Sequence, residues 1–122
     1  MQRGYPGFAG NPVLPYPSFQ VNAGQDCWIE CTFLNRYRVP EQPITLTYRI
    51  DDLTDNQVVL GVTIVAPTGT SQEIRIPASL NVMAQQYRSS QINQVTVVST
   101  YSDGSTDTQI GVYELIAIYS AS

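Results

Sequence analysis

The residues with the greatest chemical potential are three carboxylates in one short segment, Asp51, Asp52 and Asp55. Two carboxylates about 5–10 Å apart in a cleft could catalyse glycoside hydrolysis, and clustered carboxylate oxygens could bind Ca²⁺. Segment 51–56 also has the composition of a turn, because Asp, Asn and Thr side chains bond to their own backbone. The spacing lacks the regular loop and the glycine of a calcium-binding hand. We therefore expect a structural turn, with neither catalysis nor calcium binding.

The composition excludes most other chemistry. The chain has no His, so the commonest metal ligand and general base are missing, and with them the Ser-His and Cys-His nucleophile systems. Its six arginines are scattered and its net charge is −4, so no basic stripe is available to neutralise phosphates. The sequence predicts a protein that is not an enzyme, holds no metal or cofactor, and does not bind nucleic acid directly.

The loop at 35–42 carries two arginines around a tyrosine, Arg36, Tyr37 and Arg38. Such a pair can hold a phosphate or a carboxylate. The simpler interpretation is a solvated loop in which Glu41 compensates part of the charge, and this is the one we favour.

The two cysteines, Cys27 and Cys31, lie four residues apart in one expected strand. Their Cα atoms would be about 13 Å apart in an extended chain, beyond the ~7 Å limit for a disulfide. We expect both to be reduced, buried and apolar in character, as in a protein made in a reducing cytoplasm.

Alternation of apolar and polar residues predicts an antiparallel hairpin over 43–65, which the rest of the chain covers. Its apolar rows are Ile44, Leu46, Tyr48 and Ile50 on the first strand and Val58, Leu60, Val62 and Ile64 on the second. Similar patterns with turn signals between them recur along the chain. They predict about seven strands, near 18–22, 26–34, 44–50, 57–65, 72–77, 94–101 and 108–119.

This pattern is typical of an all-β fold, an antiparallel sandwich of the immunoglobulin-like or fibronectin-like kind. The Asp103-Gly104 pair predicts a tight turn before the last strand. Between 78 and 91, helical spacing of Leu80, Met83 and Tyr87 predicts one or two turns of helix that close one end of the core.

Two positions in the expected strands bear on binding. Alternation with Cys27 and Ile29 turns Trp28 outward, where it could serve an interface, stack on a sugar, or be half covered by the N-terminal segment. The last strand is apolar on both faces and carries Tyr113 and Tyr119, so we expect it to be covered on both sides, by that segment or by a neighbouring subunit.

Residues 1–17 form an extended arm in this interpretation, and residues 18–122 form the sandwich domain. Four prolines and three glycines exclude a helix or a central strand from the arm. Large apolar groups at irregular spacing suggest that the arm binds a partner. These candidate partner-binding residues are Tyr5, Phe8, Val13, Leu14 and Tyr16.

The surface composition is typical of a protein that forms contacts with other proteins. Charged residues make up only 13% of the chain, and neutral polar groups, which are less costly to desolvate, take their place. No run of about 18 apolar residues and no basic-then-apolar N-terminal pattern is present, so neither a membrane span nor a signal peptide is expected.

Three segments, LTYRIDDLT at 46–54, IRIPASLN at 74–81 and QVTVVSTYSDG at 94–104, precede a hydrophobic final strand. This layout resembles the small β-sandwich structural proteins of tailed bacteriophages over about residues 40–119. The resemblance implies a virion location and no catalytic residue. It implies a capsid cement or decoration protein that binds the major capsid protein and makes homo-oligomer contacts, or a tail or head-tail connector accessory protein. A carbohydrate-binding module that uses Trp28 is the alternative from another class.

Overall fold

The computed structural model describes residues 16–85 and 88–117, which contain seven β-strands. Each strand predicted from the sequence has its counterpart within a few residues. The strands are β1 (Phe19–Asn22), β2 (Cys27–Thr32), β3 (Thr45–Asp52), β4 (Gln57–Val65), β5 (Ser71–Ile76), β6 (Ser90–Thr100) and β7 (Thr106–Ile116).

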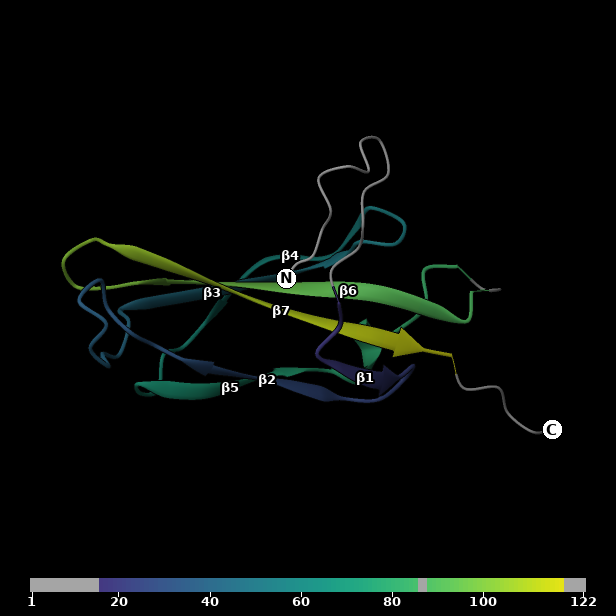
Figure 1. Cartoon of the computed structure of the whole chain (residues 1–122), viewed down its shortest axis with the longest axis horizontal. Coiled ribbons are helices and arrows are strands. Elements are labelled where there is room, and N and C mark those ends of the chain that lie inside the picture. The colour runs from purple at the N-terminus through teal and green to yellow at the C-terminus, as the bar shows by residue number, and fades with distance from the viewer. Residues whose placement is uncertain (1–15, 86–87, 118–122) are drawn as a thin grey trace.

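The strands form two sheets that lie one above the other (Figure 1). The larger sheet has the order β1-β7-β6-β3-β4, and the smaller one pairs β2 with β5. All pairs are antiparallel except β1 with β7, which run parallel. The adjacency of β3, β6 and β7 in one sheet and of β2 and β5 in the other is the immunoglobulin-like strand arrangement. The all-β sandwich predicted from the sequence is therefore confirmed.

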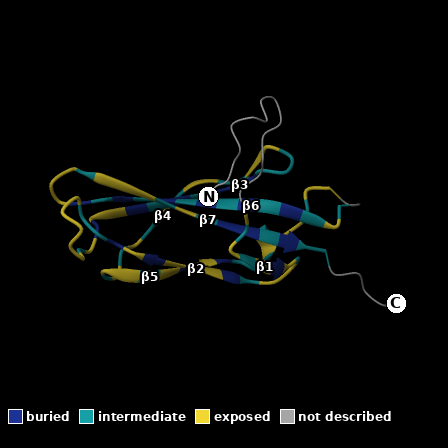
Figure 2. Ribbon diagram, in the orientation of Figure 1, coloured by how far each residue is buried: buried dark blue, intermediate teal, exposed yellow. Residues whose placement is uncertain are grey.

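The core lies between the two sheets, where strand alternation delivers one apolar row from each strand. Figure 2 shows exposed positions along β5 and in the end turns, with buried positions inside the sandwich. On β2 the alternation is as predicted, with Trp28 outward between buried Cys27 and Ile29. Both cysteines are free and buried, as expected. The most completely buried apolar residues include Phe33, Leu46, Ile50, Ile76, Val95 and Leu115.

The predicted burial of the second hairpin strand is wrong. Of the expected row, only Leu60 packs on the core, whereas Val58, Val62 and Ile64 are 59%, 69% and 82% exposed. The register of β4 against β3 shifts between Tyr48 and Asp51, and each extra residue in a bulge changes which side chains face inward. Ile44, expected to begin the inward row of β3, lies before the strand and is 58% exposed.

The helix predicted over 78–91 is also wrong. A single 3₁₀ turn, η1 (Ala78–Leu80), is present, and β6 already begins at Ser90. Leu80 and Met83 still pack against the core. Their apolar spacing therefore predicted correctly that they are buried, but not that the segment is helical. Tyr87 lies outside the described residues.

Among the described residues, no helix is long and apolar enough to cross a membrane. The N-terminal arm lies almost wholly outside them, with only Tyr16 and Pro17 of residues 1–17 described.

Candidate binding surfaces

The outer face of the larger sheet, defined as the face turned away from β2 and β5, carries an apolar row on β4. Ile64 pairs with Thr47 and Val58 pairs with Asp51, and both partners point away from the buried side of β3. Val62 lies two residues from Ile64, so it shares that face. Ile110 on β7, 60% exposed, lies on the same face three strands away.

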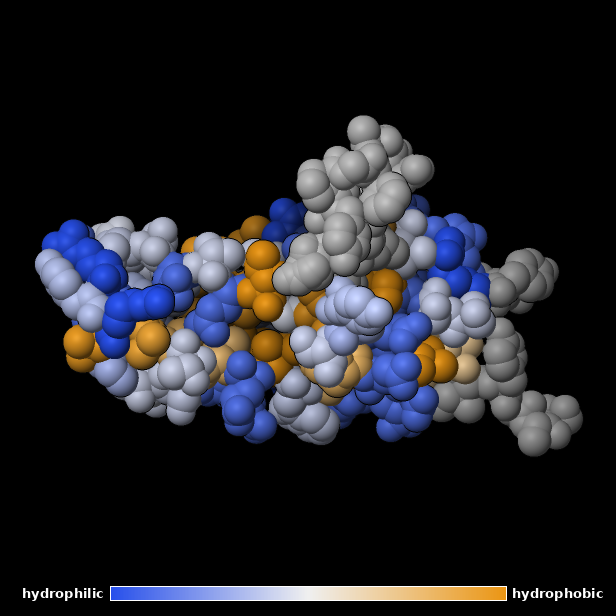
Figure 3. Space-filling model, in the orientation of Figure 1, coloured by the Kyte–Doolittle hydropathy of each residue, from blue (hydrophilic) through white to orange (hydrophobic). Residues whose placement is uncertain are grey.

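β4 is also a sheet edge without charge. The other sheet edges in the described structure carry charges or are short: β2 has Glu30, β5 has Glu73 and Arg75, and β1 is four residues long. Edge strands are normally protected by such devices. Bulges twist β4 and reduce its capacity to pair with another strand. A partner would therefore contact the outward side chains of β4 and not its backbone edge. Figure 3 shows hydrophobic side chains at the surface in the middle of the visible face, where β6 and β7 are nearer the viewer than β4 (Figure 1).

A second surface lies on the other side of the sandwich, around Trp28, which is 51% exposed. A shallow groove of about 420 Å³ runs between β1 and the start of β2, with Trp28, Gln20, Asn22, Gln25 and Asp26 among its lining residues.

A buried polar network holds the turn that frames this groove. Asn81 is fully buried and its Nδ2 donates to Gln25 O at 2.7 Å, while its backbone oxygen accepts from Gly24 N at 2.7 Å. Tyr113 Oη donates to Asn81 Oδ1 at 2.7 Å and accepts from Asn93 Nδ2 at 3.2 Å. Since buried amides must be hydrogen-bonded, this chain of contacts fixes the turn to β6 and β7.

Tyr113 therefore belongs to the core and not to the interface expected for it. It is fully buried, its ring stacks on Phe19 with centroids 5.5 Å apart, and burial raises the pKa of its hydroxyl to about 12.

The other residues singled out for partner binding are placed as follows. Trp28 is half exposed and Tyr16 is 95% exposed, with no shared surface described for the two. Tyr5, Phe8, Val13, Leu14 and Tyr119 lie outside the described residues.

The turn acids are structural, as the sequence suggests, but one of them is unexpectedly buried. Asp52 is fully buried, and its Oδ1 accepts from Thr54 N at 2.9 Å and Asp55 N at 3.0 Å. Its Oδ2 and that of Asp55 are buried without a hydrogen-bond donor among the described residues. Arg88 pairs with the other oxygen of Asp55. Burial, together with the nearby Asp55, raises the pKa of Asp52.

These acids do not assemble into a metal site. Within residues 16–85 and 88–117, no group of three or more His, Cys, Asp or Glu side chains is placed to hold a metal ion. Asp51 points outward, where Arg49 Nη2 donates to its Oδ1 at 2.7 Å. The guanidinium of Arg88 next to Asp55 further disfavours a cation there.

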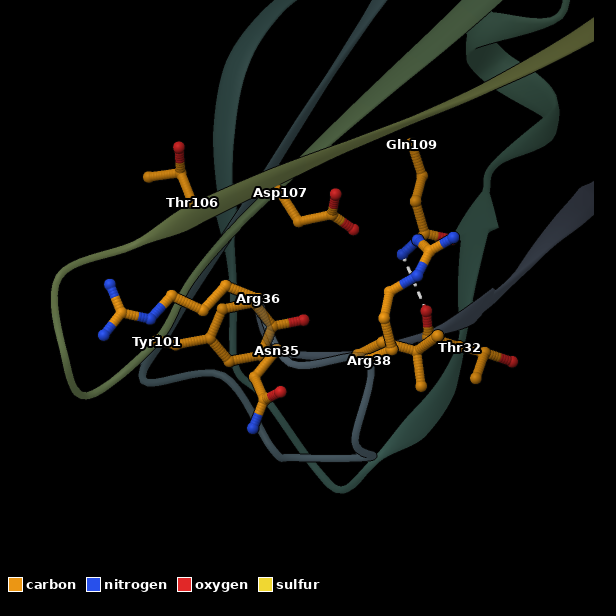
Figure 4. Close-up of a pocket in the computed structure, with 9 residues that line it drawn as sticks. Thr32, Asn35, Arg36, Arg38, Tyr101, Thr106, Asp107 and Gln109 are labelled. Carbon is orange, nitrogen blue, oxygen red and sulfur yellow. Dashed lines mark hydrogen bonds between the residues drawn. The ribbon is translucent and has the colours of Figure 1, made fainter.

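The arginine loop lines a cavity of about 310 Å³ at the end of the sandwich (Figure 4). Arg36 is paired with Asp103 at 3.2 Å and lies over the Tyr37 ring at 4.9 Å. In Figure 4 its side chain extends away from Arg38, which lies beside Gln109, and Asp107 points into the same space. Two diverging arginines with a carboxylate between them do not form an anion clamp, so the solvated-loop interpretation fits better.

Sequence reasoning missed the buried amides and the exposed row of β4. Gln91 and Asn93 stand in the same alternating row as Val95 and Val97, which was the available signal that they face inward. Comparison with known proteins adds no relative: no family model, curated protein sequence or solved structure matches this chain.

Proposed function

We propose that this protein is a non-enzymatic structural component of a virion, a cement protein that docks on the capsid shell through the outer face of its larger sheet. The single observation that carries the docking surface is the uncharged strand β4, with Val58, Val62 and Ile64 at 59–82% exposure. The virion location rests on the sequence resemblance alone.

Burial of this row would supply the binding free energy. Each large aliphatic side chain that becomes fully buried contributes about 1.5–3 kcal/mol before the costs of association are subtracted. The outward row of β3 consists of Thr45, Thr47, Arg49 and Asp51. The hydroxyls are less costly to desolvate than charges, and the two charged side chains are paired with each other at 2.7 Å. Over many identical sites the stabilisation of the shell would sum, while each copy binds with the affinity of its own contact.

The arm is proposed to add to this contact as a clamp. Its apolar residues Tyr5, Phe8, Val13, Leu14 and Tyr16 follow no strand or helix period, which suits a segment that becomes ordered on a partner. Residues 1–17 can be removed without cutting β1, which begins at Phe19.

The test is binding to capsid shells stripped of accessory proteins, with occupancy and survival of heat and osmotic shock both scored. Val62→Ser with Ile64→Ser should lower occupancy at least about tenfold, and deletion of 1–17 should lower it further. The matched control is Val39→Ser with Val82→Ser, which removes two exposed valines, 52% and 58% exposed, outside the outer face. Equal binding of the two double variants would reject the docking face. Failure of the unaltered protein to bind shells, with binding to tail tubes instead, would favour the tail-accessory role.

A further inference from the structure

Trp28 is the single tryptophan of the chain, and the fold places it half exposed on the surface. On β2 it stands between buried Cys27 and Ile29, so it projects from the smaller sheet away from the core. Its cross-strand partner is Arg75 on β5, an outward position as well. An aromatic side chain of this size at a half-exposed position can serve as a flat apolar platform.

The groove beside Trp28 is lined by uncharged amides. Gln20, Asn22 and Gln25 are all exposed residues of β1 and of the turn that follows it. Gln20 Nε2 donates to Glu114 at 2.9 Å. No side-chain hydrogen bond of Asn22 or Gln25 to any other residue of 16–85 or 88–117 is present. Two amides, each with donors and an acceptor, are thus available to a ligand.

The charge in the groove is already neutralised. Asp26 Oδ2 accepts from Arg75 Nε at 3.2 Å and Nη2 at 3.0 Å, and its Oδ1 accepts from Ala78 N at 2.7 Å. Arg75 lowers the pKa of Asp26, so this carboxylate stays ionised and keeps lone pairs for hydroxyl donors. No cationic side chain lines the described groove, and the nearby Arg75 is already paired with Asp26. A phosphate or an acidic ligand therefore has no cationic partner there.

The turn that frames the groove is held by hydrogen bonds within the protein, so the groove is preformed. Ala23 N donates to Ile116 O at 2.8 Å, and the buried Asn81 holds both Gly24 and Gln25. A preformed site loses little conformational entropy on binding. The groove lies where β1, an edge strand of the larger sheet, meets the start of β2 in the smaller sheet. Because β4 is the opposite edge of the larger sheet, a partner docked on β4 would leave the groove open.

We propose that the Trp28 groove binds a neutral saccharide. A pyranose ring has one face of C–H groups, which matches the apolar face of an indole, and a rim of hydroxyls, which match amide and carboxylate partners. This site goes beyond the docking function and does not depend on it. In a shell-bound protein it would present a sugar-binding surface to the outside of the particle.

The test exploits the single tryptophan, whose fluorescence reports ligand directly. The full chain is titrated with oligosaccharides of glucose, galactose, mannose and N-acetylglucosamine, each as a neutral hexamer. At least one should give a saturable change with Kd of about 1 mM or below, and inorganic phosphate should give none. No response to any of the four sugars, or a response to phosphate alone, would overturn the proposal.

Variants then locate the site. Ligand-observed NMR, which does not need the fluorophore, should show that Trp28→Ala weakens binding about tenfold or more, and that the pair Asn22→Ala, Gln25→Ala weakens it several-fold. Tyr37→Ala is the matched control, since Tyr37 is 67% exposed at a different place in the fold, and it should bind as the unaltered protein does. If Trp28→Ala does not fold, the variant Asn22→Ala, Gln25→Ala is the remaining test. An unchanged affinity of that variant for the saccharide would reject the site.

Discussion

At the scale of single residues, Asp52 is the side chain whose environment differs most from expectation. A carboxyl on a turn tip should be solvated, yet the last residue of β3 turns inward and is fully buried. Its pKa is raised above the ordinary value of 3.8, chiefly by burial. The folded protein therefore keeps a proton on Asp52 over a pH range in which the unfolded chain has lost it.

The consequence is a defined pH dependence of stability. The free energy of unfolding should fall as pH rises from about 4 through the raised pKa of Asp52 and then level off. Asp52→Asn should remove this slope, because an amide does not titrate in this pH range. The amide keeps the acceptor for Thr54 N and Asp55 N and can donate to Asp55, so the turn should be retained. Urea unfolding at several pH values measures it. The control is Asp51→Asn, which removes the partly buried ion pair with Arg49 and should leave the slope in place.

Asp26 and Asp103 act in the opposite direction and in another pH range. Hydrogen bonds from Arg75 to Asp26 and from Ser105 to Asp103 lower the pKa of both carboxyls. Their contribution to stability is present above the ordinary pKa and is lost as pH falls through the lowered values. A slope that persists below pH 4 in Asp52→Asn is therefore expected and does not contradict the assignment.

Tyr113 gives the second prediction at this scale. Tyr113→Phe keeps the ring against Phe19 but leaves Asn81 Oδ1 and Asn93 Nδ2 without their partner, which should cost about 1–3 kcal/mol of stability. In ultraviolet titration of the unaltered protein, Tyr113 should ionise at about pH 12. Because burial also raises the pKa of Tyr48, Tyr113→Phe should lose one of the late-ionising tyrosines. Tyr16→Phe, at a 95% exposed position, should change stability by less than about 0.5 kcal/mol. An unchanged number of late-ionising tyrosines in Tyr113→Phe would contradict the assignment.

At the scale of elements, two glycines should differ in how well they tolerate substitution by alanine. Gly104 lies in the turn between β6 and β7, and Gly111 lies in the middle of β7. Gly104 has φ of +86°, and its N–H donates to Tyr101 O at 2.9 Å. Gly104→Ala should therefore destabilise the protein by about 1 kcal/mol. Gly111 lies in a strand, and an added Cβ would meet Ile29 Cδ1 at 3.6 Å, an ordinary contact, so Gly111→Ala should be neutral or slightly stabilising. Urea midpoints compare the two, and equal effects would mean that the turn tolerates an L residue.

The predictability of each element from sequence depends on its surroundings. β2 and β6 are flanked by well-defined inner and outer sides, so alternation located their inward rows, including Cys27, Cys31, Val95 and Val97. In β4 the register shifts change the phase of the pattern. Gly61, which lies between Leu60 and Thr63 at one of these shifts, was the available sequence signal for a bulge.

Polar burial is harder to anticipate from sequence than apolar burial. The inward positions of Asn81 and Asn93 are stable only because Tyr113, distant in the sequence, supplies the matching hydroxyl. Periodicity shows that a side chain faces inward, but hydrogen-bond partners 20 to 32 residues away are set by the strand order. The groove beside Trp28 depends on the same long-range contacts, which is why the sequence suggested the tryptophan and not the amides around it.

At the scale of the whole molecule, the two proposed surfaces lie on opposite sides of one thin sandwich. The outer face belongs to the sheet with the order β1-β7-β6-β3-β4, and Trp28 projects from the sheet of β2 and β5. Binding through one surface should not obstruct the other, because the core separates them. This separation makes the orientation of the docked protein measurable.

Acrylamide quenching of Trp28 fluorescence reports that orientation. The fluorescence of the tryptophans in the shell proteins is measured on shells that carry the Trp28→Phe variant, and it is subtracted from the total. If the outer face docks, the quenching constant of Trp28 should be the same free and shell-bound, within about 20%, because a half-exposed indole keeps its access to solvent. If the smaller sheet docks, Trp28 loses that access and quenching falls several-fold. Protection of Trp28 together with normal shell occupancy would place the docking surface on β2 and β5. The apolar row of β4 would then require another partner, and a second copy of this chain is the one its lack of charge allows.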